Sequence, residues 1–400
     1  MKRLFRSIYD WFVSVARVIR RQFHLTFTDL GVMTFFLFLP LVYPLIYSLI
    51  YNPEVTRDMP VVVVDDCRTA MSREFVRQCD ATEAISIIGY AANMSEAREC
   101  LNEHRSYAIL EIPKDYEQHL GRGEQGVVHF YCDMSLLFRY RTFLMSLTTL
   151  QVDECSRLRQ IAFNTIGIPD NRAPSSIQPQ AFMLGDTQQG FASFIIPGIV
   201  VLVLQQAMLL GISMLSGWSN ERRRKYGFDP FQIRCSASAT VLGKGLAFTV
   251  IFFPLAIFTL HFVPEIFHYP HIGDPLQYLA LILPMLMATS FLGISIEGIM
   301  RERETCFIAI VFTSVIFLFL SGLTWPRYAM NPIFVILGNF IPATWAVEGF
   351  VQINSTGAGL NEVSAQYLWL WGLVVFYMLT AVVVTRYRDN RRLVPASVRR

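Results

Sequence analysis

The sequence is poor in charge. Only 16% of its 400 residues are Asp, Glu, Lys or Arg, whereas charged residues make up about a quarter of a typical soluble chain, and 53% are hydrophobic. The formal net charge is +3, and Lys and Arg gather in particular loops instead of following one stripe, which argues against nucleic-acid binding. The composition therefore predicts that the bilayer is the main solvent of this chain.

The sequence also lacks the motifs of an enzyme or a nucleotide-binding protein. It contains no G-x-x-x-x-G-K-[ST] loop, whose backbone amides and lysine bind phosphates. Gly185 and Gly190 have the right spacing but are followed by Phe191 and Ala192, which fits a flexible connection to a membrane helix. G-x-S-x-G, H-E-x-x-H and C-x-x-C are absent as well. We therefore predict that this chain has no catalytic residues and binds no metal or cofactor.

Residues 1–28 lack the short apolar run and small-residue cleavage site of a secretory signal. Their apolar side chains recur at helical spacing, and most of the arginines lie off that stripe. This pattern predicts an amphipathic helix on the cytoplasmic membrane surface, and a helix packed against a partner protein is the alternative. The stripe consists of Leu4, Phe5, Ile8, Trp11, Phe12, Val15, Val18 and Ile19.

Stretches of about 20 residues with almost no charge are long enough to cross a hydrocarbon core of about 30 Å. We predict six transmembrane helices, the first over 29–51 and the others within 189–385. The later five are Phe191–Gly217, Ala239–Val263, Leu276–Met300, Cys306–Leu323 and Tyr367–Thr385.

Six crossings place both termini on one side of the membrane. The Lys and Arg of the short loops predict that this side is cytoplasmic, because basic loops are retained there. The basic segments are Lys2–Arg21, Arg222–Lys225 with Arg234, Arg301 with Arg303, and the tail 386–400.

Charge returns between the first and second spans, over 52–188, and short apolar units alternate there. Strands that alternate with helices predict a small α/β domain, which the topology places on the extracytoplasmic side. The predicted strands are Val61–Val64, Ala84–Tyr90, Tyr107–Ile112 and Val127–Tyr131. The predicted helices are Ser72–Cys79, Ser95–His104, Pro113–Leu120 and Ser135–Asn164, and Ile168–Pro179 leads back to the membrane.

Five of the seven cysteines lie in this domain, where an oxidising compartment would permit disulfides. Cys67 follows the first strand and Cys79 ends the next helix, so the two are candidates for a disulfide. The alternative is that both are buried thiols that act as small hydrophobic side chains.

The interiors of the spans contain almost no ionisable side chains, which argues against an ion-coupled transporter. Lys244 and Glu297 fall near the cytoplasmic ends, where snorkelling to the interface accounts for both. The segment 324–362 is too apolar for an ordinary loop and too broken by proline and glycine for one straight span. It predicts a re-entrant or interfacial hairpin on the outer side.

Three local patterns occur in order within this layout. The first is Ser219-Asn-Glu-Arg-Arg-Arg-Lys-Tyr-Gly227 after the second span, and the second is Leu242-Gly-Lys244 at the start of the third. The third is Ser321-Gly322 followed by Pro326, Pro332, Pro342 and Glu348. The chain thereby resembles the permease subunit of ABC-2 type ATP-binding-cassette exporters, in the subgroup with a large extracytoplasmic domain after the first span. It departs from the family at Phe228, where the family usually has Thr.

The resemblance implies a permease of a bacterial inner membrane that moves a hydrophobic or amphipathic substrate of unknown identity outward. Two permease chains, identical or paralogous, would form the path, and cytoplasmic ATPase subunits would bind the ATP. A periplasmic adaptor or the cargo would meet the outer domain. The coupling contacts to the ATPase would come from Glu221, Arg222, Arg223, Arg224, Lys225 and Gly227.

Two alternatives remain open at this point. The cluster Arg222–Lys225 could merely set the topology and touch anionic membrane lipids. The whole chain could be a membrane receptor or scaffold that senses through its outer domain, although its cytoplasmic segments are only short loops and tails.

Overall fold

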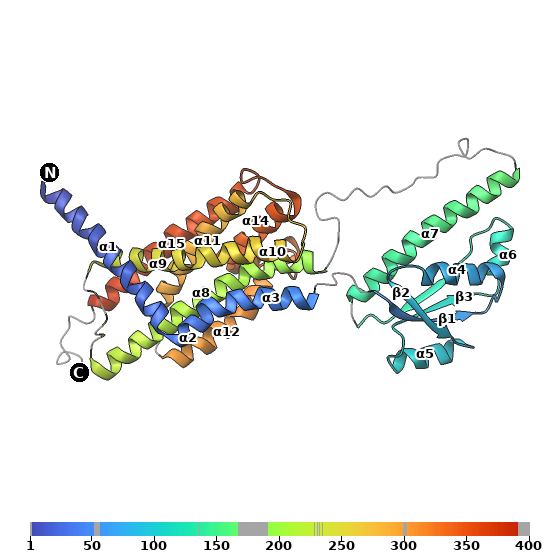
Figure 1. Ribbon diagram of the computed structural model, residues 1–400, viewed down its shortest axis with the longest axis horizontal. Helices are drawn as coiled ribbons and strands as arrows, with labels where there is room; N and C mark the ends of the chain where they lie inside the picture. Colours follow the sequence, from blue (N-terminus) through green and yellow to red (C-terminus); the bar gives the residue numbers. More distant parts are fainter. Residues whose placement is uncertain are drawn as a thin grey trace. The chain divides into compact units, whose positions relative to one another are not determined.

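The computed structural model describes residues 2–51, 57–135, 137–166, 191–227, 229, 231, 233, 235–298 and 302–390 (Figure 1). The chain divides into two compact units. One comprises Met1–Asn52 with Phe182–Arg400 and is called the helical unit below, and the other is Pro53–Ala181. The predicted segment Ile168–Pro179, along with Phe228, Arg234, Arg301 and residues 391–400, lies outside the described residues.

Among its described residues the helical unit contains six helices that are long and apolar enough to cross a membrane, as predicted. The first is built from α2 (Leu30–Met33), a π-helical turn η1 (Thr34–Phe38) and α3 (Leu39–Tyr51). The second is α8 (Phe191–Tyr226). The third begins with α9 (Ala237–Ile257) and continues through the π-turn η3 (Phe258–Phe262) into α10 (Val263–Ile266). The last three are α11 (Pro275–Ile296), α12 (Arg303–Leu320) and α15 (Ser364–Asn390).

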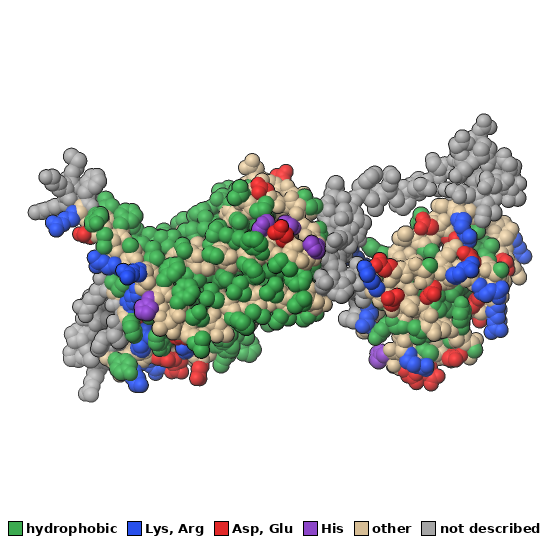
Figure 2. Space-filling model, in the orientation of Figure 1, with side chains coloured by type: hydrophobic (Ala, Val, Ile, Leu, Met, Phe, Trp, Pro, Cys, Tyr) green, Lys and Arg blue, Asp and Glu red, His purple; other side chains and the backbone are tan. Residues whose placement is uncertain are grey.

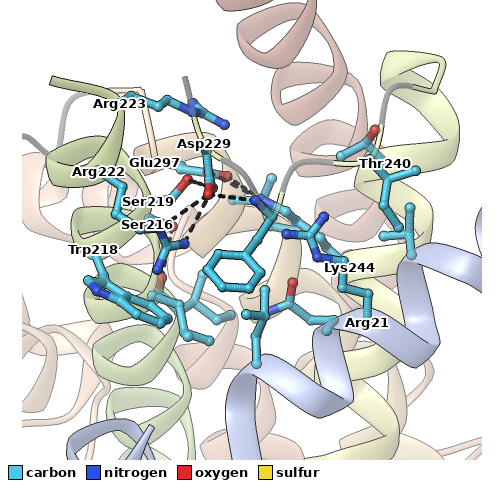
Figure 3. Close-up of a pocket in the computed structure, with 18 of the residues that line it drawn as sticks. Arg21, Ser216, Trp218, Ser219, Arg222, Arg223, Asp229, Thr240, Lys244 and Glu297 are labelled. Carbon is cyan, nitrogen blue, oxygen red and sulfur yellow. Dashed lines mark hydrogen bonds and ion pairs between the residues drawn. The ribbon is translucent and has the colours of Figure 1, made fainter. Parts of the chain in front are cut away.

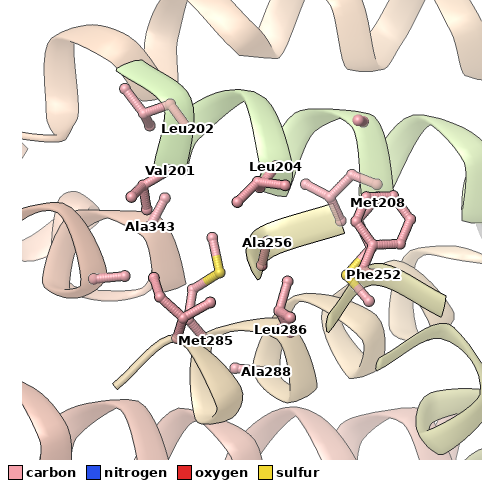
Figure 4. Packing of buried hydrophobic residues seen from close by; sticks show 14 of the residues in the cluster. Val201, Leu202, Leu204, Met208, Phe252, Ala256, Met285, Leu286, Ala288 and Ala343 are labelled. Carbon is pink, nitrogen blue, oxygen red and sulfur yellow. The ribbon is translucent and has the colours of Figure 1, made fainter. Parts of the chain in front are cut away.

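Helix α8 is the central helix of the unit, because it packs against α3, α11, α12 and α14 (Pro342–Thr356). Within its apolar span 72% of the residues are buried, whereas 17% are buried in α12. Figure 4 shows the core between these helices, where Leu204 and Met208 of α8 lie near Phe252 of α9 and Leu286 of α11. A helix buried on most of its circumference needs an apolar surface all round, which is what the sequence of α8 provides.

Small residues allow the helices to approach closely, as is common in membrane bundles. A Cβ at Gly211 of α8 would overlap the ring of Phe36, which is itself fully buried. A Cβ at Gly217 would lie 2.9 Å from the backbone of Arg303. Gly211 and Gly217 therefore serve the close packing of α8 against η1 and α12.

Two prolines explain the π-turns. Proline has no backbone N–H to donate and its ring crowds the preceding turn. Each π-turn ends two residues before a proline, η1 before Pro40 and η3 before Pro264, and the backbone N–H that follows each turn donates to a carbonyl five residues earlier. The first span thus stays continuous through Pro40 and Pro44 by widening one turn.

Residues 324–362 form a helix pair, as predicted for this apolar and broken segment. Helix α13 (Pro332–Asn339) and helix α14 meet at 92°, and a short 3₁₀ turn, η4 (Arg327–Ala329), precedes them. The guanidinium of Arg327 lies over the ring of Trp345 at 4.4 Å and donates to Glu348 of α14 at 2.8 Å. These contacts tie the start of the hairpin to its second helix.

The inserted unit is a small α/β domain, as the alternating pattern predicts. Its sheet has the order β2-β1-β3-β4, in which β1 pairs in parallel with β2 and β3, and β4 is antiparallel to β3. The strands are β1 (Met59–Asp65), β2 (Ile85–Tyr90), β3 (Ala108–Ile112) and β4 (His129–Cys132). The helices are α4 (Ala70–Asp80), α5 (Met94–Asn102), α6 (Tyr116–Gly121) and α7 (Leu137–Ile166).

Both faces of this sheet are covered, and alternate residues of β1 point to opposite faces. Val61 and Val63 pack with Phe75 of α4 and Phe143 of α7, whereas Val62 packs with α5 on the other face. A strand buried on both sides reads as a continuous apolar run, which is why Val61–Val64 carries no polar residue.

The candidate disulfide is not formed. All seven cysteines, which lie within the described residues, are free thiols. Cys79 is fully buried in the core between the sheet and α4, and Cys67 packs against the same core. Burial raises the pKa of the Cys79 thiol to about 12, so it stays neutral and acts as a small hydrophobic side chain.

We expect Gly211→Ala to lower the melting temperature of the detergent-purified protein, because the added methyl overlaps the buried ring of Phe36. Overpacking of this kind costs about 1–3 kcal/mol. Gly372→Ala in α15 is the matched control, since its added Cβ has no described atom within 4 Å apart from its chain neighbours and the backbone of its own helix, and alanine favours the helix. Equal melting temperatures for the two variants would contradict the close packing of α8 on η1.

Candidate functional site

Charged side chains of the helical unit concentrate at one end, called the basic end below. It is formed by α1 (Lys2–Thr28), the last turns of α8, α11 and α15 and the first turns of α9 and α12. In Figure 2 Lys and Arg gather there, and apolar side chains cover the middle of the unit on the face shown. The predicted coupling residues and Lys244 all lie at this end.

Helix α1 is amphipathic, as predicted, and its buried side packs on α9. Val15 and Val18 are buried, and a Cβ at Gly243 of α9 would lie 2.8 Å from Val18. The indole of Trp11 donates to the hydroxyl of Ser238 at 3.2 Å. On the other side Phe12 is 60% exposed, so α1 keeps an apolar surface for lipid or for a partner.

The coupling residues predicted on α8 fall into two groups. Glu221 and Arg222 make contacts inside the protein: the Glu221 carboxylate accepts from the backbone N–H of Arg303 at 2.7 Å, and Arg222 pairs with Asp229 at 3.1 Å. Arg224 and Lys225 are exposed. Arg224 still reaches Glu302 at 2.7 Å, in a pair that is exposed on both sides.

Arg222 is held more firmly than the sequence suggested. Its guanidinium lies 3.6 Å from the centre of the Trp218 ring and 5.0 Å from that of Phe231 (Figure 3). Burial raises the pKa of Asp229, but hydrogen bonds from Ser219 and Arg222 outweigh this effect and keep the pKa below its usual value. The pair therefore stays charged and folds the segment after α8 back onto its last turn.

The other predicted coupling residues have structural roles as well. Arg223 is half-buried and donates to Asn220 at 3.5 Å. Gly227 ends α8 with φ of 78°, a left-handed conformation that favours glycine after a helix.

Lys244 and Glu297 do not snorkel independently, so that prediction was wrong. The Lys244 ammonium contacts both oxygens of Glu297, at 3.0 and 3.1 Å, and Arg388 of α15 reaches the same carboxylate at 2.8 Å. The Glu297 side chain is only 3% exposed. One buried carboxylate thus joins α9, α11 and α15, because each charge is cheaper to bury beside its partner than alone.

A second buried ion pair joins the first span to α12. The guanidinium of Arg303 binds Asp29 through two hydrogen bonds, at 2.6 and 3.0 Å. Burial raises the pKa of Asp29, but the hydrogen bonds from Arg303 and from the backbone N–H of Val32 outweigh this effect. The pKa of Asp29 is therefore below its usual value. Asp29 also caps α2, so one carboxylate begins the first span and anchors the fifth.

The pairing partners Asp29, Asp229 and Arg388 are site residues that reasoning from the sequence missed. Asp229 bonds to Arg222, which is 7 positions away along the chain, and Asp29 bonds to Arg303, which is 274 positions away. For Asp29 and Arg388 the available signal was a charge within a few residues of the end of an apolar stretch, where a partner is needed.

A cavity of about 70 Å³ lies among these groups at the basic end (Figure 3). Helices α1, α8, α9, α11 and α15 all contribute to its wall. In Figure 3 the charged groups of Arg222, Asp229, Lys244 and Glu297 gather around it. No group of three or more His, Cys, Asp or Glu that could hold a metal occurs among the described residues.

The six apolar helices found in the described residues, with charged side chains gathered at one end, define a multi-pass membrane protein. The chain belongs to the ABC-2 transporter family, because the family model described as ABC-2 family transporter protein matches residues 31–383. It is similar to the linearmycin resistance permease protein LnrN of Bacillus subtilis (strain 168), with 21% identity over 334 residues that cover 76% of this chain and 81% of the relative. The family confirms a transport permease that works with an ATPase subunit.

We expect Glu297→Gln to lower the melting temperature strongly, because it leaves Lys244 and Arg388 side by side without their shared counter-charge. Breaking one partner of a buried pair costs about 3–5 kcal/mol. Glu302→Gln is the control at the same end, since its pair with Arg224 is exposed and is worth at most about 1 kcal/mol. Thermal unfolding of both variants in one detergent measures the difference, and a larger loss for Glu302→Gln would contradict the role of the triad.

Proposed function

We propose that this chain is the permease subunit of an exporter in a bacterial inner membrane, with both termini in the cytoplasm. The observation that carries the proposal is the exposed end of α8, where Arg224 and Lys225 extend beyond an apolar bundle to which the same helix is central. A push on this end would be transmitted along one continuous 36-residue helix.

The internal contacts of Glu221 and Arg222 support this role in a different way from the one first expected. They fix the end of α8 to α12 and to the returning segment, so a force on Arg224 and Lys225 would move several spans together. The ATPase subunit binds the ATP in this proposal. Its contact surface should be acidic where it meets the two exposed cations.

We further propose that the substrate is hydrophobic or amphipathic, and that a second permease chain, identical or paralogous, completes the path. The name of one relative refers to linearmycin resistance, which supports export of a compound harmful to the cell. The α/β domain would lie outside, where it receives the cargo or docks a periplasmic adaptor.

Neutralising both exposed cations with Arg224→Gln and Lys225→Gln should weaken co-purification of the ATPase subunit and its stimulation by the permease. Two exposed charge pairs contribute about 1–2 kcal/mol together, which corresponds to roughly a tenfold change in affinity. The melting temperature should stay unchanged, because neither side chain is buried.

The control for this pair is Arg57→Gln with Arg105→Gln, which removes the same charge from exposed positions of the α/β domain. Assembly should be normal in this control. If the α8 variant assembles and transports as well as the wild type, the assignment of these two residues as the coupling contact is wrong.

The orientation can be tested with single cysteines at two exposed positions, Gln118 of α6 and Arg224 of α8. In intact cells an impermeant maleimide should label Gln118→Cys above the background of the parent protein, while Arg224→Cys should react only after the membrane is opened. The reverse pattern would place the basic end outside.

A further inference from the structure

The cavity at the basic end carries more positive than negative charge. Its wall contains five cationic and two anionic side chains among the described residues. The cations are Arg21, Arg222, Arg223, Lys244 and Arg388, and the anions are Asp229 and Glu297. Three positive charges are therefore in excess around one small volume at the end of a membrane bundle.

Both carboxylates are already occupied by other partners. Glu297 accepts from Lys244 and Arg388, and Asp229 accepts from Ser219, from Arg222 and from the backbone N–H of Phe231. Neither acid is left to neutralise the cation that α1 contributes.

That cation is Arg21. Within the described part of the chain it forms no ion pair, and its guanidinium carbon lies 5.9 Å from the centre of the Phe231 ring. Burial lowers the pKa of Arg21, the attraction of Asp229 opposes this, and the charge of Arg222 lowers the pKa further. The Nη1 group of Arg222 is also buried and has no hydrogen-bond partner among the described residues. The Arg21 guanidinium and the Nη1 group of Arg222, on different helices, are therefore both available to an added acceptor.

The space suits a small oxyanion. A cavity of about 70 Å³ is several times larger than the roughly 10–15 Å³ that one water molecule needs. Guanidinium groups bind phosphate through paired, charge-assisted hydrogen bonds, which makes phosphate a better match than a halide. Part of the wall is apolar, formed by Leu25, Ile212, Leu215 and Phe248, so a hydrocarbon segment attached to the anion would also find a compatible surface.

We propose that this cavity binds a phosphate group through Arg21 of α1 and Arg222 of α8. The phosphate belongs either to the headgroup of an anionic phospholipid or to free inorganic phosphate, and basic pockets between membrane helices suit such headgroups. The bound anion joins α1 to the end of α8 and offsets the excess charge. Binding needs neither the ATPase subunit nor ATP, so it is independent of the coupling role of Arg224 and Lys225.

The test uses the full-length permease purified in a neutral detergent without phosphate buffer. Its melting temperature is measured with increasing inorganic phosphate against sodium chloride of equal ionic strength, and with micelles containing phosphatidylglycerol against phosphatidylcholine. A rise with inorganic phosphate identifies the free anion as a ligand, and a rise with phosphatidylglycerol alone identifies the lipid headgroup. No rise above the matched control with either probe overturns the proposal.

Three variants locate the site. Arg21→Gln should raise the half-saturating concentration about tenfold, because a charge-assisted hydrogen bond is lost. Arg21→Lys keeps the charge and should retain most of the response. Arg20→Gln removes the same charge from the neighbouring exposed position of α1 and should respond like the wild type. An equal loss for Arg20→Gln and Arg21→Gln overturns the proposal, because it shows a surface charge effect only. If Arg21→Gln does not fold, the responses of the wild type, Arg21→Lys and Arg20→Gln to the two probes are compared, and this comparison decides whether the proposal stands.

Discussion

The architecture depends on how charges at the ends of apolar helices are neutralised. Water is excluded between packed membrane helices, so a charge there must find its counter-ion on another helix or carry a large desolvation cost. Glu297 provides one such counter-ion for Lys244 and Arg388, and Asp29 provides another for Arg303. These two carboxylates connect the first, third, fourth, fifth and sixth spans at one end of the bundle.

Close packing along the second span complements these ion pairs. Helix α8 is central, and glycines at its contacts with η1 and α12 bring backbones close together. The hydrophobic effect contributes little to helix association inside a bilayer, so association depends on van der Waals contacts, and these require such close approach. The polar end sets which helices meet, and the apolar length of α8 provides the surface against which they pack. The exposed end of α8 is consequently attached to almost the whole bundle.

Local patterns were enough to predict the elements but not their long-range partners. The six spans followed from uncharged length, the α/β domain from alternating strands and helices, and α1 from its periodicity, since each of these signals is contained in a short window of sequence. The partner of Lys244 lies 53 positions away and that of Arg303 lies 274 positions away, and no local window contains both. The sequence also suggested that Arg222 faces a partner protein, whereas in the structure its guanidinium lies against Trp218. A run of four cations does not indicate which of them will pack inside the protein.

The π-turn in the first span has a geometrical consequence. A turn closed by a bond to the fifth residue back contains one residue more than an α-helical turn, and in an α-helix one residue corresponds to a rotation of about 100° about the axis. Everything after Phe38 is therefore turned relative to the course that α2 would have taken without the widening. The ladder of Tyr43, Tyr47 and Tyr51 along α3, whose rings follow one another at 4.5 and 5.7 Å, owes its azimuth to that extra residue. A single deletion within Thr34–Phe38 would remove the extra residue and leave the tyrosines facing the same way, whereas an α-helical turn without a deletion would aim them at a different neighbour.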